Sequence, residues 1–352
     1  MSLDGIDTPA VLVDLDKAEA NIRAFQAYAD RHGLKVRPHI KTHKLPRLAA
    51  YQVAQGAVGI TCQKVSEAEA MVVGGEVDDV LITYNILGEK KLRRLRALSE
   101  RIRLSVVADN LVVAEGLSAT FRGAEGPLDV LVECNTGADR CGVESPEAAA
   151  ELAKAIEAMP GLRFAGLMTY PPIGKPGAVA DWLGRAKALI EAEGIGVPTI
   201  SSGGSPDIWK AHEMPLATEY RVGTYVYNDG FLVGQGTCAW EDCALTVLAT
   251  VVSVPAENRA VIDAGSKVLT SDLLGLEGHG RILGRPDLAI DQLSEEHGRI
   301  VSEGPVGLAV GQRLRIVPNH ACVVSNMLDQ VELVRGETYL GSTPVAARGK
   351  VW

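Results

Sequence analysis

The sequence predicts an α/β fold in which an N-terminal (β/α)₈ TIM barrel over residues 1–232 precedes a β domain over residues 233–352, with the first few residues able to pack against the β domain. Continuous apolar strands alternate with helical patterns through the first two-thirds of the chain, which is typical of a parallel sheet. Eight such units in about 230 residues match a barrel in number and size. After them come strands and turns with no long helical pattern. A doubly wound open sheet is the alternative, but the count of eight favours the barrel.

The predicted barrel strands are short apolar runs separated by Gly and Pro at the joints. They span residues 11–15, 35–40, 59–63, 79–84, 103–109, 128–134, 163–170 and 199–204. Between them, stretches such as 16–33 and 145–159 repeat apolar residues at helical spacing. The strand-like runs of the β domain are residues 244–255, 259–267, 313–319 and 330–336.

Composition excludes several classes of function. The net charge of −9 argues against nonspecific binding to nucleic acid or to an anionic membrane surface. No apolar run approaches the roughly 18 residues of a membrane span, and no signal peptide is evident. Six cysteines are scattered without the spacing of a disulfide framework, which predicts reduced thiols in a cytoplasmic protein.

The segment RPHIKTHK, residues 37–44, gathers basic residues in a chain that is acidic overall. Active sites of parallel barrels lie at the carboxyl ends of the strands, and Lys41 falls just past the second predicted strand. Pro38 stiffens the approach, and the neighbouring arginine and histidines add charge that favours a neutral amine. Such an amine can form a Schiff base with a cofactor aldehyde. The plain alternative is that Lys41 and Lys44 are solvated loop lysines.

A cofactor such as pyridoxal phosphate also needs a phosphate cradle. The segment SSGGSPDI, residues 201–208, follows the last predicted barrel strand, where this architecture usually binds phosphate. Gly203 and Gly204 could free backbone N–H groups for an anion, and three nearby hydroxyl groups could add donors: Ser201, Ser202 and Ser205. A Gly-Gly turn alone is weak evidence for such a cradle.

The next segment, residues 219–229, continues the candidate site. If it is extended, its alternate side chains lie on one face of the strand. That face would carry Arg221, Gly223 and Tyr225.

Together these motifs resemble the alanine-racemase-like group of pyridoxal phosphate enzymes, and within it the D-threonine aldolase and D-serine dehydratase family. The segments that carry the resemblance are TPAVLVDLDKAEANI, RPHIKTHK, CQKVSEAEA, GADRCGV, SSGGS, RVGTYVYND and PNHAC. They span nearly the whole chain, and PHIKTHK and PNHAC are the most specific. The resemblance implies a barrel with a C-terminal β domain, a homodimer with its active site near the subunit interface, and a small D-amino acid as substrate.

The resemblance also suggests roles for single residues. It assigns the Schiff base to Lys41 rather than Lys44, and it places Arg140 near the cofactor's phenolic oxygen or the substrate carboxylate. A structural salt bridge is the alternative for Arg140. Arg221 matches an arginine that faces the pyridine nitrogen and weakens the cofactor as an electron sink.

Relatives commonly carry a histidine-bearing loop behind a tyrosine after the seventh strand. This chain has Tyr170 but no histidine there, so its substrate recognition is expected to differ. The expected cofactor-binding residues are Lys41, Ser202, Gly203, Gly204, Arg221, Gly223 and Tyr225, and the expected catalytic residues are Lys41, Arg140 and Tyr170.

The segment VPNHACVVSN, residues 317–326, suggests a metal site. His320 and Cys322 are two positions apart, so on a strand they face the same side. An imidazole and a thiolate suit zinc, with manganese or magnesium as other possibilities. A buried His beside a buried Cys is the more common meaning of such a pair. The resemblance changes this, because family members hold a divalent ion at a His-x-Cys or His-x-Asp position.

The expected reaction is that of a lyase acting on a β-hydroxy D-amino acid. The better-known aldolases carry a carboxylate at the second ligand position, whereas animal-type D-serine dehydratases carry cysteine. Cys322 therefore slightly favours dehydration to a keto acid and ammonia over retro-aldol cleavage to glycine and an aldehyde. Less favoured are a racemase, which needs no metal, and a non-catalytic pyridoxal phosphate carrier, which resembles the barrel alone. A metal-independent enzyme with a Schiff base between Lys41 and a carbonyl substrate is a further alternative.

Overall fold

The computed structural model describes residues 3–352, which divide into two compact units. The barrel unit comprises Phe25–Lys41, Pro46–Gly223 and Lys350–Trp352. The β unit comprises the described residues up to Ala24, together with Thr42–Leu45 and Thr224–Gly349. The sequence predicts a single boundary after residue 232, whereas the chain passes between the two units several times.

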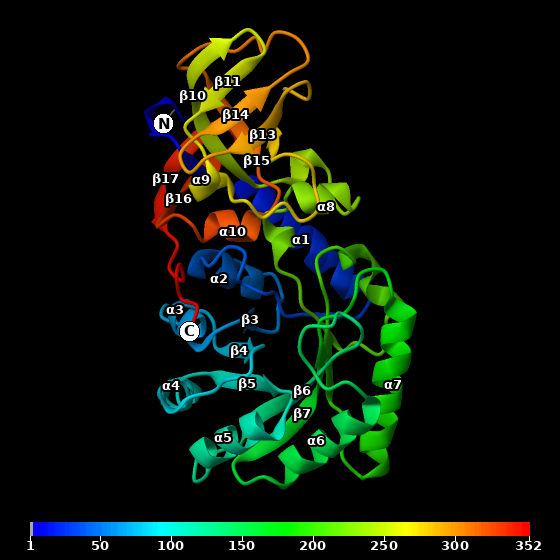
Figure 1. Ribbon diagram of the computed structural model, residues 1–352. Helices are drawn as coiled ribbons and strands as arrows, with labels where there is room; N and C mark the ends of the chain where they lie inside the picture. Colours follow the sequence, from blue (N-terminus) through cyan, green and yellow to red (C-terminus); the bar gives the residue numbers. More distant parts are fainter. Residues whose placement is uncertain (1–2) are drawn as a thin grey trace. The chain divides into compact units, whose positions relative to one another are not determined.

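The barrel unit contains an eight-stranded parallel sheet (Figure 1). Its order is β2-β9-β8-β7-β6-β5-β4-β3, and a parallel bridge between His39 and Thr61 links the two ends of this order. The curled sheet confirms the predicted barrel. The strands are β2 (Lys35–Val36), β3 (Ile60–Cys62), β4 (Asp79–Ile82), β5 (Arg103–Ala108), β6 (Leu128–Cys134), β7 (Leu162–Thr169), β8 (Thr199–Ser202) and β9 (Glu219–Tyr220).

Helices cover the outside of the barrel, and α6 packs against α7 (Figure 1). Their ends follow local rules: the Ser145 side chain caps α6 by accepting from the backbone N–H of Ala148, and Pro146 occupies the first turn. The helices are α2 (Pro46–Ala54), α3 (Val65–Met71), α4 (Glu89–Ser99), α5 (Leu111–Phe121), α6 (Pro146–Ala158), α7 (Pro176–Ala192) and the 3₁₀ helix η2 (Ile208–Glu213), while α1 (Leu15–Arg31) begins in the β unit.

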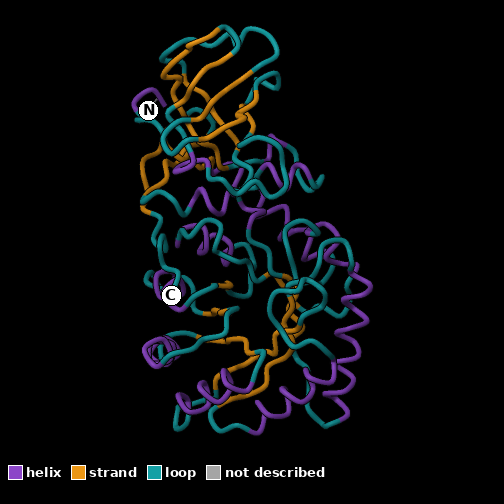
Figure 2. The backbone as a smooth tube through the Cα atoms, viewed as in Figure 1, coloured by secondary structure: helices purple, strands orange, loops and turns teal. Residues whose placement is uncertain are grey.

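The β unit is built on a nine-stranded, mostly antiparallel sheet, drawn in orange in Figure 2. The long strand β10 pairs with β1, β11 and β15, so it is the centre of the sheet. The strands are β1 (Ala10–Asp14), β10 (Leu245–Ala256), β11 (Arg259–Ile262), β12 (Arg281–Ile282), β13 (Ala289–Leu293), β14 (Gly298–Val301), β15 (Arg313–Val317), β16 (Gln330–Arg335) and β17 (Thr338–Pro344). Short helices join them: η1 (Leu3–Gly5), η3 (Thr224–Val226), α8 (Gly230–Gly234), η4 (Trp240–Asp242), α9 (Ser266–Leu269) and α10 (Ala321–Ser325).

The structure corrects the assignment of the first predicted strand. Residues 11–15 do form a strand, β1, but it pairs with β10 and β16 in the β unit instead of with a barrel strand. The eighth barrel strand is β9, only two residues long. All five residues of β1 are buried, and a buried apolar run looks the same in either sheet, so the sequence pattern could not separate the two.

No helix within residues 3–352 combines the length and apolar character required to cross a membrane.

Strands β7 and β8 approach each other closely at Gly166, which adopts a φ of +134°. A Cβ atom there would lie 2.0 Å from the carbonyl oxygen of Thr199. We therefore expect Gly166→Ala to lower the free energy of unfolding by about 2 kcal/mol or more. Gly116, inside α5, is the control, because its Cβ would meet only Leu92 at 3.7 Å. Chemical denaturation should show Gly116→Ala to be neutral or stabilising, and an equal effect of both variants would contradict this account.

Candidate cofactor and metal sites

Lys41 is half-buried beyond β2, at the carboxyl end of the barrel strands. The backbone before it is held on both sides: the N–H of His39 donates to the Val222 carbonyl at 2.7 Å, and the N–H of Ile40 donates to that of Thr61 at 3.0 Å. Because β1 belongs to the other sheet, β2 is the first strand of the barrel instead of the second. The predicted strand-end position of Lys41 is unchanged by this correction.

His39 in the same segment is buried and neutral. The backbone N–H of Lys41 donates to its Nδ1 at 3.3 Å, so Nε2 carries the hydrogen and donates to Oε1 of Gln63 at 3.1 Å. The pKa of His39 is well below its usual value because burial disfavours the imidazolium and because the Lys41 ammonium lies nearby. Part of the positive charge that the sequence suggested around Lys41 is therefore absent.

The turn after β8 offers an anion cradle. Gly203 has a φ of +139°, and a Cβ atom there would lie 2.5 Å from the Arg221 carbonyl oxygen. Ser202 Oγ is fully buried and has no hydrogen-bond partner among the described residues. A buried hydroxyl without a partner is costly, and a phosphate oxygen would supply one. Ser201, which the sequence grouped with it, is already used, since its hydroxyl donates to Glu219 Oε1 at 2.6 Å.

Arg140 and Tyr170 lie together beside this turn. The guanidinium carbon of Arg140 is 4.5 Å from the centre of the Tyr170 ring, a cation–π contact. The Tyr170 ring is 3.8 Å from the position that a Cβ of Gly204 would take. Arg140 Nη2 also lies 3.8 Å from Oε1 of Glu133, which is buried. Burial raises the pKa of Glu133, and Arg140 partly offsets this.

Arg221 is buried with its guanidinium inside the barrel unit. Its Nε donates to Ser201 Oγ at 2.8 Å, and its Nη2 donates to the Thr169 carbonyl. Burial lowers the pKa of Arg221 to about 10, although Glu219 and Glu133 act in the opposite direction. Arg221 therefore stays protonated at neutral pH.

The segment after β9 does not continue as a strand. β9 ends at Tyr220, and Thr224–Val226 forms the 3₁₀ helix η3. Gly223 belongs to the barrel unit, whereas Tyr225 belongs to the β unit. The expectation that Arg221, Gly223 and Tyr225 share one face of an extended segment is therefore wrong. Glycine and valine neighbours in this segment suit an extended chain as well as a turn, so the local sequence could not exclude it.

His320 and Cys322 meet in the β unit, but not on a strand. His320 occupies the N-cap position of α10 without a capping bond from its side chain, and Cys322 lies in the first turn of the helix. Asp229 fixes this helix start by accepting the N–H of Ala321 at 3.0 Å. Burial alone would lower the pKa of His320, but hydrogen bonding and attraction to Cys322, with Asp272, raise it to about 9. The sequence predicted that alternation along a strand brings these two side chains together, whereas the start of helix α10 does so in the structure.

Further polar groups surround this pair. His320 Nδ1 lies 2.7 Å from Oδ2 of Asp272, which leaves Nε2 for a metal ion, and such a carboxylate commonly orients a ligand histidine. The hydroxyl of Thr42 lies 3.0 Å from Cys322 Sγ, and that of Thr224 lies 3.5 Å from it. Within residues 3–352 no group of three or more His, Cys, Asp or Glu side chains is arranged to hold a metal. The pair fits an ion that keeps open coordination positions, as catalytic ions do.

Three residues of these sites have no sequence signal: Asp272, Glu133 and Glu219. Each is far along the chain from the motif it serves, and single acidic residues carry no local pattern. Thr42 lay inside the RPHIKTHK segment, but nothing in that segment indicated a bond to a cysteine 280 positions away.

Comparison with known proteins agrees with this architecture. The family model of the alanine racemase N-terminal domain matches residues 13–230, and that of a serine dehydratase domain matches residues 244–334. A D-threonine aldolase from Arthrobacter sp is 35% identical over 98% of this chain and 93% of its own. The crystal structure of D-threonine aldolase from Filomicrobium marinum superposes with a TM-score of 0.93 at 34% identity, covering 100% of this chain and 98% of that one.

The chain belongs to the D-threonine aldolase and D-serine dehydratase family of alanine-racemase-like pyridoxal phosphate enzymes. A dehydratase is also among its relatives: D-threo-3-hydroxyaspartate dehydratase from Delftia sp. HT23 is 30% identical over 90% of this chain and 91% of its own. That enzyme has been solved with a histidine replaced by alanine and, in a metal-free form, with a cysteine two positions further along replaced by alanine. The same His-x-Cys spacing separates His320 and Cys322.

The buried neutral state of His39 predicts a pH dependence of stability. Because the folded protein holds the pKa of His39 far below the usual 6.5, only the unfolded chain takes up this proton as the pH falls through that value. Stability should therefore fall below about pH 6.5, by up to about 1.4 kcal/mol per pH unit from this group. Thermal unfolding at several pH values should show a smaller loss for His39→Gln. The exposed residue His297 is the control, and His297→Gln should keep the native profile. An unchanged slope in His39→Gln would contradict the assignment.

Proposed function

We propose that this protein is a lyase dependent on pyridoxal 5'-phosphate and a divalent metal, that it acts on a β-hydroxy D-amino acid, and that dehydration is its main reaction. The observation that carries the choice of dehydration is the His320–Cys322 pair, which has the spacing of the histidine and cysteine replaced in the Delftia dehydratase. A thiolate at this position distinguishes the chain from the aldolase pattern, in which a carboxylate is expected.

The barrel unit supports a cofactor site. Lys41 would hold the aldehyde, and the Ser202–Gly204 turn would hold the phosphate, because Ser202 Oγ has no partner within residues 3–352 and Gly203 leaves no room for a side chain. Arg221 would face the pyridine nitrogen with its guanidinium already oriented by Ser201 and Thr169. Gly223 and Tyr225 remain proposed cofactor contacts. When bound, pyridoxal phosphate supplies an electron sink for a carbanion at Cα of the substrate.

Arg140 and Tyr170 are proposed to bind and orient the substrate. Arg140 is half-exposed, so its guanidinium can donate two hydrogen bonds to a substrate carboxylate, while the Tyr170 ring holds the guanidinium in place. Glu133, whose Oε1 lies 3.8 Å from Arg140 Nη2, supplies a carboxyl partner for this guanidinium. His39 remains neutral and donates to Gln63, so its part is to hold the segment that leads to Lys41.

His320 and Cys322 are proposed to hold the metal, with zinc preferred because thiolate is a soft ligand, and with manganese or magnesium as alternatives. The ion would supply Lewis-acid activation of the substrate's β-hydroxyl group. Asp272 keeps the imidazole of His320 in one orientation, and Thr42 and Thr224 hydrogen-bond the sulfur of Cys322. These contacts restrict the pair before any ion binds, which lowers the cost of ordering the ligands.

Retro-aldol cleavage to glycine and an aldehyde is the second candidate. It is favoured by overall similarity, since the Arthrobacter and Filomicrobium aldolases are 35% and 34% identical to this chain. We further propose that the protein is cytoplasmic, as six free cysteines suggest, and that it forms a homodimer. Its partner is a small-molecule D-amino acid, and no nucleic acid or membrane partner is expected.

One assay separates the two reactions. The purified protein is incubated with the D- and L-enantiomers of serine, threonine and 3-hydroxyaspartate, each with and without a chelator, and the products are identified. Keto acid and ammonia support dehydration, and glycine with an aldehyde supports cleavage. Turnover of only the L-enantiomers would refute both.

Removal of the metal ligand should separate cofactor binding from catalysis. We expect Cys322→Ala, like chelation, to leave the visible absorbance of bound pyridoxal phosphate intact while lyase activity falls by about 100-fold or more. Cys322→Asp should keep some metal binding, shifted toward harder ions such as manganese. Cys238→Ala, which changes another cysteine of the β unit, is the matched control and should retain activity. Native turnover by a metal-free preparation would show that the pair is structural.

The phosphate cradle makes a separate prediction. Ser202→Ala should weaken binding of pyridoxal phosphate about 10-fold, because a charge-assisted hydrogen bond from the hydroxyl to the phosphate is lost, while the melting temperature of the apoprotein stays the same or rises. Equilibrium dialysis and thermal unfolding measure the two effects. Unchanged affinity for the cofactor would place the phosphate elsewhere.

A further inference from the structure

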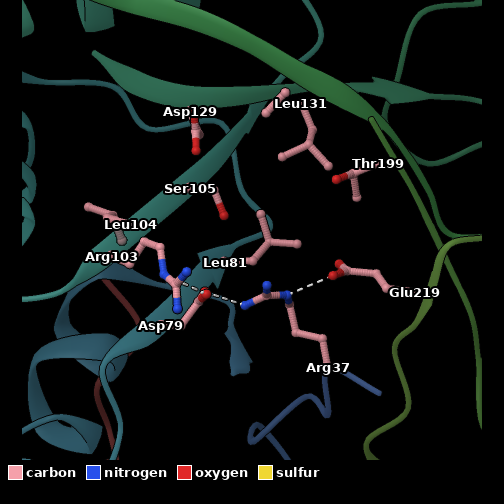
Figure 3. A pocket seen from close by; sticks show the side chains of 11 residues that line it. Arg37, Asp79, Leu81, Arg103, Leu104, Ser105, Asp129, Leu131, Thr199 and Glu219 are labelled. Carbon is pink, nitrogen blue, oxygen red and sulfur yellow. Dashed lines mark hydrogen bonds and ion pairs between the residues drawn. The ribbon is translucent and has the colours of Figure 1, made fainter. Parts of the chain in front are cut away.

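A chain of buried polar side chains runs through the barrel unit and ends at Arg221. At the amino ends of the strands a cavity of about 110 Å³ contains Arg37, Asp79 and Glu219, and Figure 3 shows Arg37 between the two carboxylates. Arg37 Nη1 donates to Asp79 Oδ1 at 2.5 Å, and its Nε donates to Glu219 Oε2 at 2.9 Å. Asp79 also accepts from Arg103 at 3.0 Å.

Glu219 joins this cluster to the opposite end of the barrel. Its second oxygen, Oε1, accepts the hydroxyl of Ser201 at 2.6 Å, and Ser201 Oγ in turn accepts Arg221 Nε at 2.8 Å. The direction of each bond is fixed, because a guanidinium can only donate and a carboxylate can only accept. Glu219 begins β9 and Arg221 directly follows its last residue, and their common contact, the hydroxyl of Ser201, shows that the two side chains lie on the same side.

The contacts of Arg221 require a counter-charge. Its guanidinium is buried, and its other identified partner is the neutral carbonyl of Thr169. Glu219 is also buried, and among the groups that raise the pKa of Arg221 it has the largest effect. Removing its negative charge would leave a cation in the barrel with a weaker set of partners.

We propose that Glu219 is a positioning residue for Arg221: acting through Ser201, it fixes the orientation of the guanidinium and supplies its counter-charge. This inference rests on the proposed cofactor site, in which Arg221 faces the pyridine nitrogen. It also assigns a role to Arg37, the first residue of the RPHIKTHK segment. Arg37 donates to Oε2 of Glu219, which leaves Oε1 to accept the hydroxyl of Ser201.

The test compares variants along the chain in the cofactor-loaded enzyme. Ser201→Ala and Glu219→Gln break the link to Arg221, and Ser201→Thr keeps a hydroxyl. Asp129→Asn is the control, because Asp129 lines the same cavity but pairs with Arg163 at the surface. The readouts are the pH dependence of the visible absorbance of bound pyridoxal phosphate, together with kcat and KM for the preferred D-amino acid.

We expect Ser201→Ala and Glu219→Gln to bind the cofactor but to show a shifted pH profile of absorbance, with kcat lowered about 10-fold and KM changed less than about threefold. Ser201→Thr and Asp129→Asn should match the native enzyme. If Glu219→Gln does not fold, the contrast between Ser201→Ala and Ser201→Thr decides. Spectra and kcat of Ser201→Ala equal to those of Asp129→Asn overturn this inference alone, whereas a native protein that binds no pyridoxal phosphate overturns the proposed function with it.

Discussion

The burial of a permanent cation inside the barrel unit is the constraint on which the candidate cofactor site depends. A guanidinium without acceptors would destabilise the fold by several kcal/mol, so the residues around Arg221 must supply oxygen atoms in fixed directions. Ser201 and Thr169 do so directly, and Glu219 does so through Ser201. The same backbone carries the cradle, because the N–H of Arg221 donates to the Ser202 carbonyl at 2.7 Å. The contacts that hold Arg221 therefore also fix the turn at Gly203.

The metal pair depends on a comparable constraint in the β unit. A helix as short as α10 contributes little stability of its own, so its start must be fixed by other contacts. Asp229 fixes the start by accepting the N–H of Ala321, and Ser325, the last residue of α10, holds the opposite end by donating to the carbonyl of Thr42. Thr42 directly follows Lys41 in the chain. Thr42, which hydrogen-bonds the sulfur of Cys322, is thus the next residue in the chain after the proposed cofactor lysine, although Lys41 and Thr42 are assigned to different units.

The sequence predicted the barrel and the β domain, because alternating apolar strands and amphipathic helices leave a strong local pattern. It placed β1 in the wrong sheet, since strand pairing is decided by distant partners such as β10 and β16. It identified Ser202 and the His320–Cys322 pair as candidates from short motifs. It attributed the convergence of the pair to a strand, although a helix start produces it. Glu219 and Asp272 were missed because one carboxylate, distant in sequence, has no signature until the fold brings it to its partner.

The proposed cofactor site depends most directly on Lys41 as the residue that binds the aldehyde. The competing residue, Lys44, is buried, and its ammonium group donates to the carbonyl of Ala347 at 3.3 Å within the β unit. Borohydride reduction of the cofactor-loaded protein, followed by peptide mapping with mass spectrometry, tests this directly. We expect a pyridoxyl group on Lys41 and an unmodified Lys44. A label on Lys44, or on any lysine other than Lys41, would contradict it.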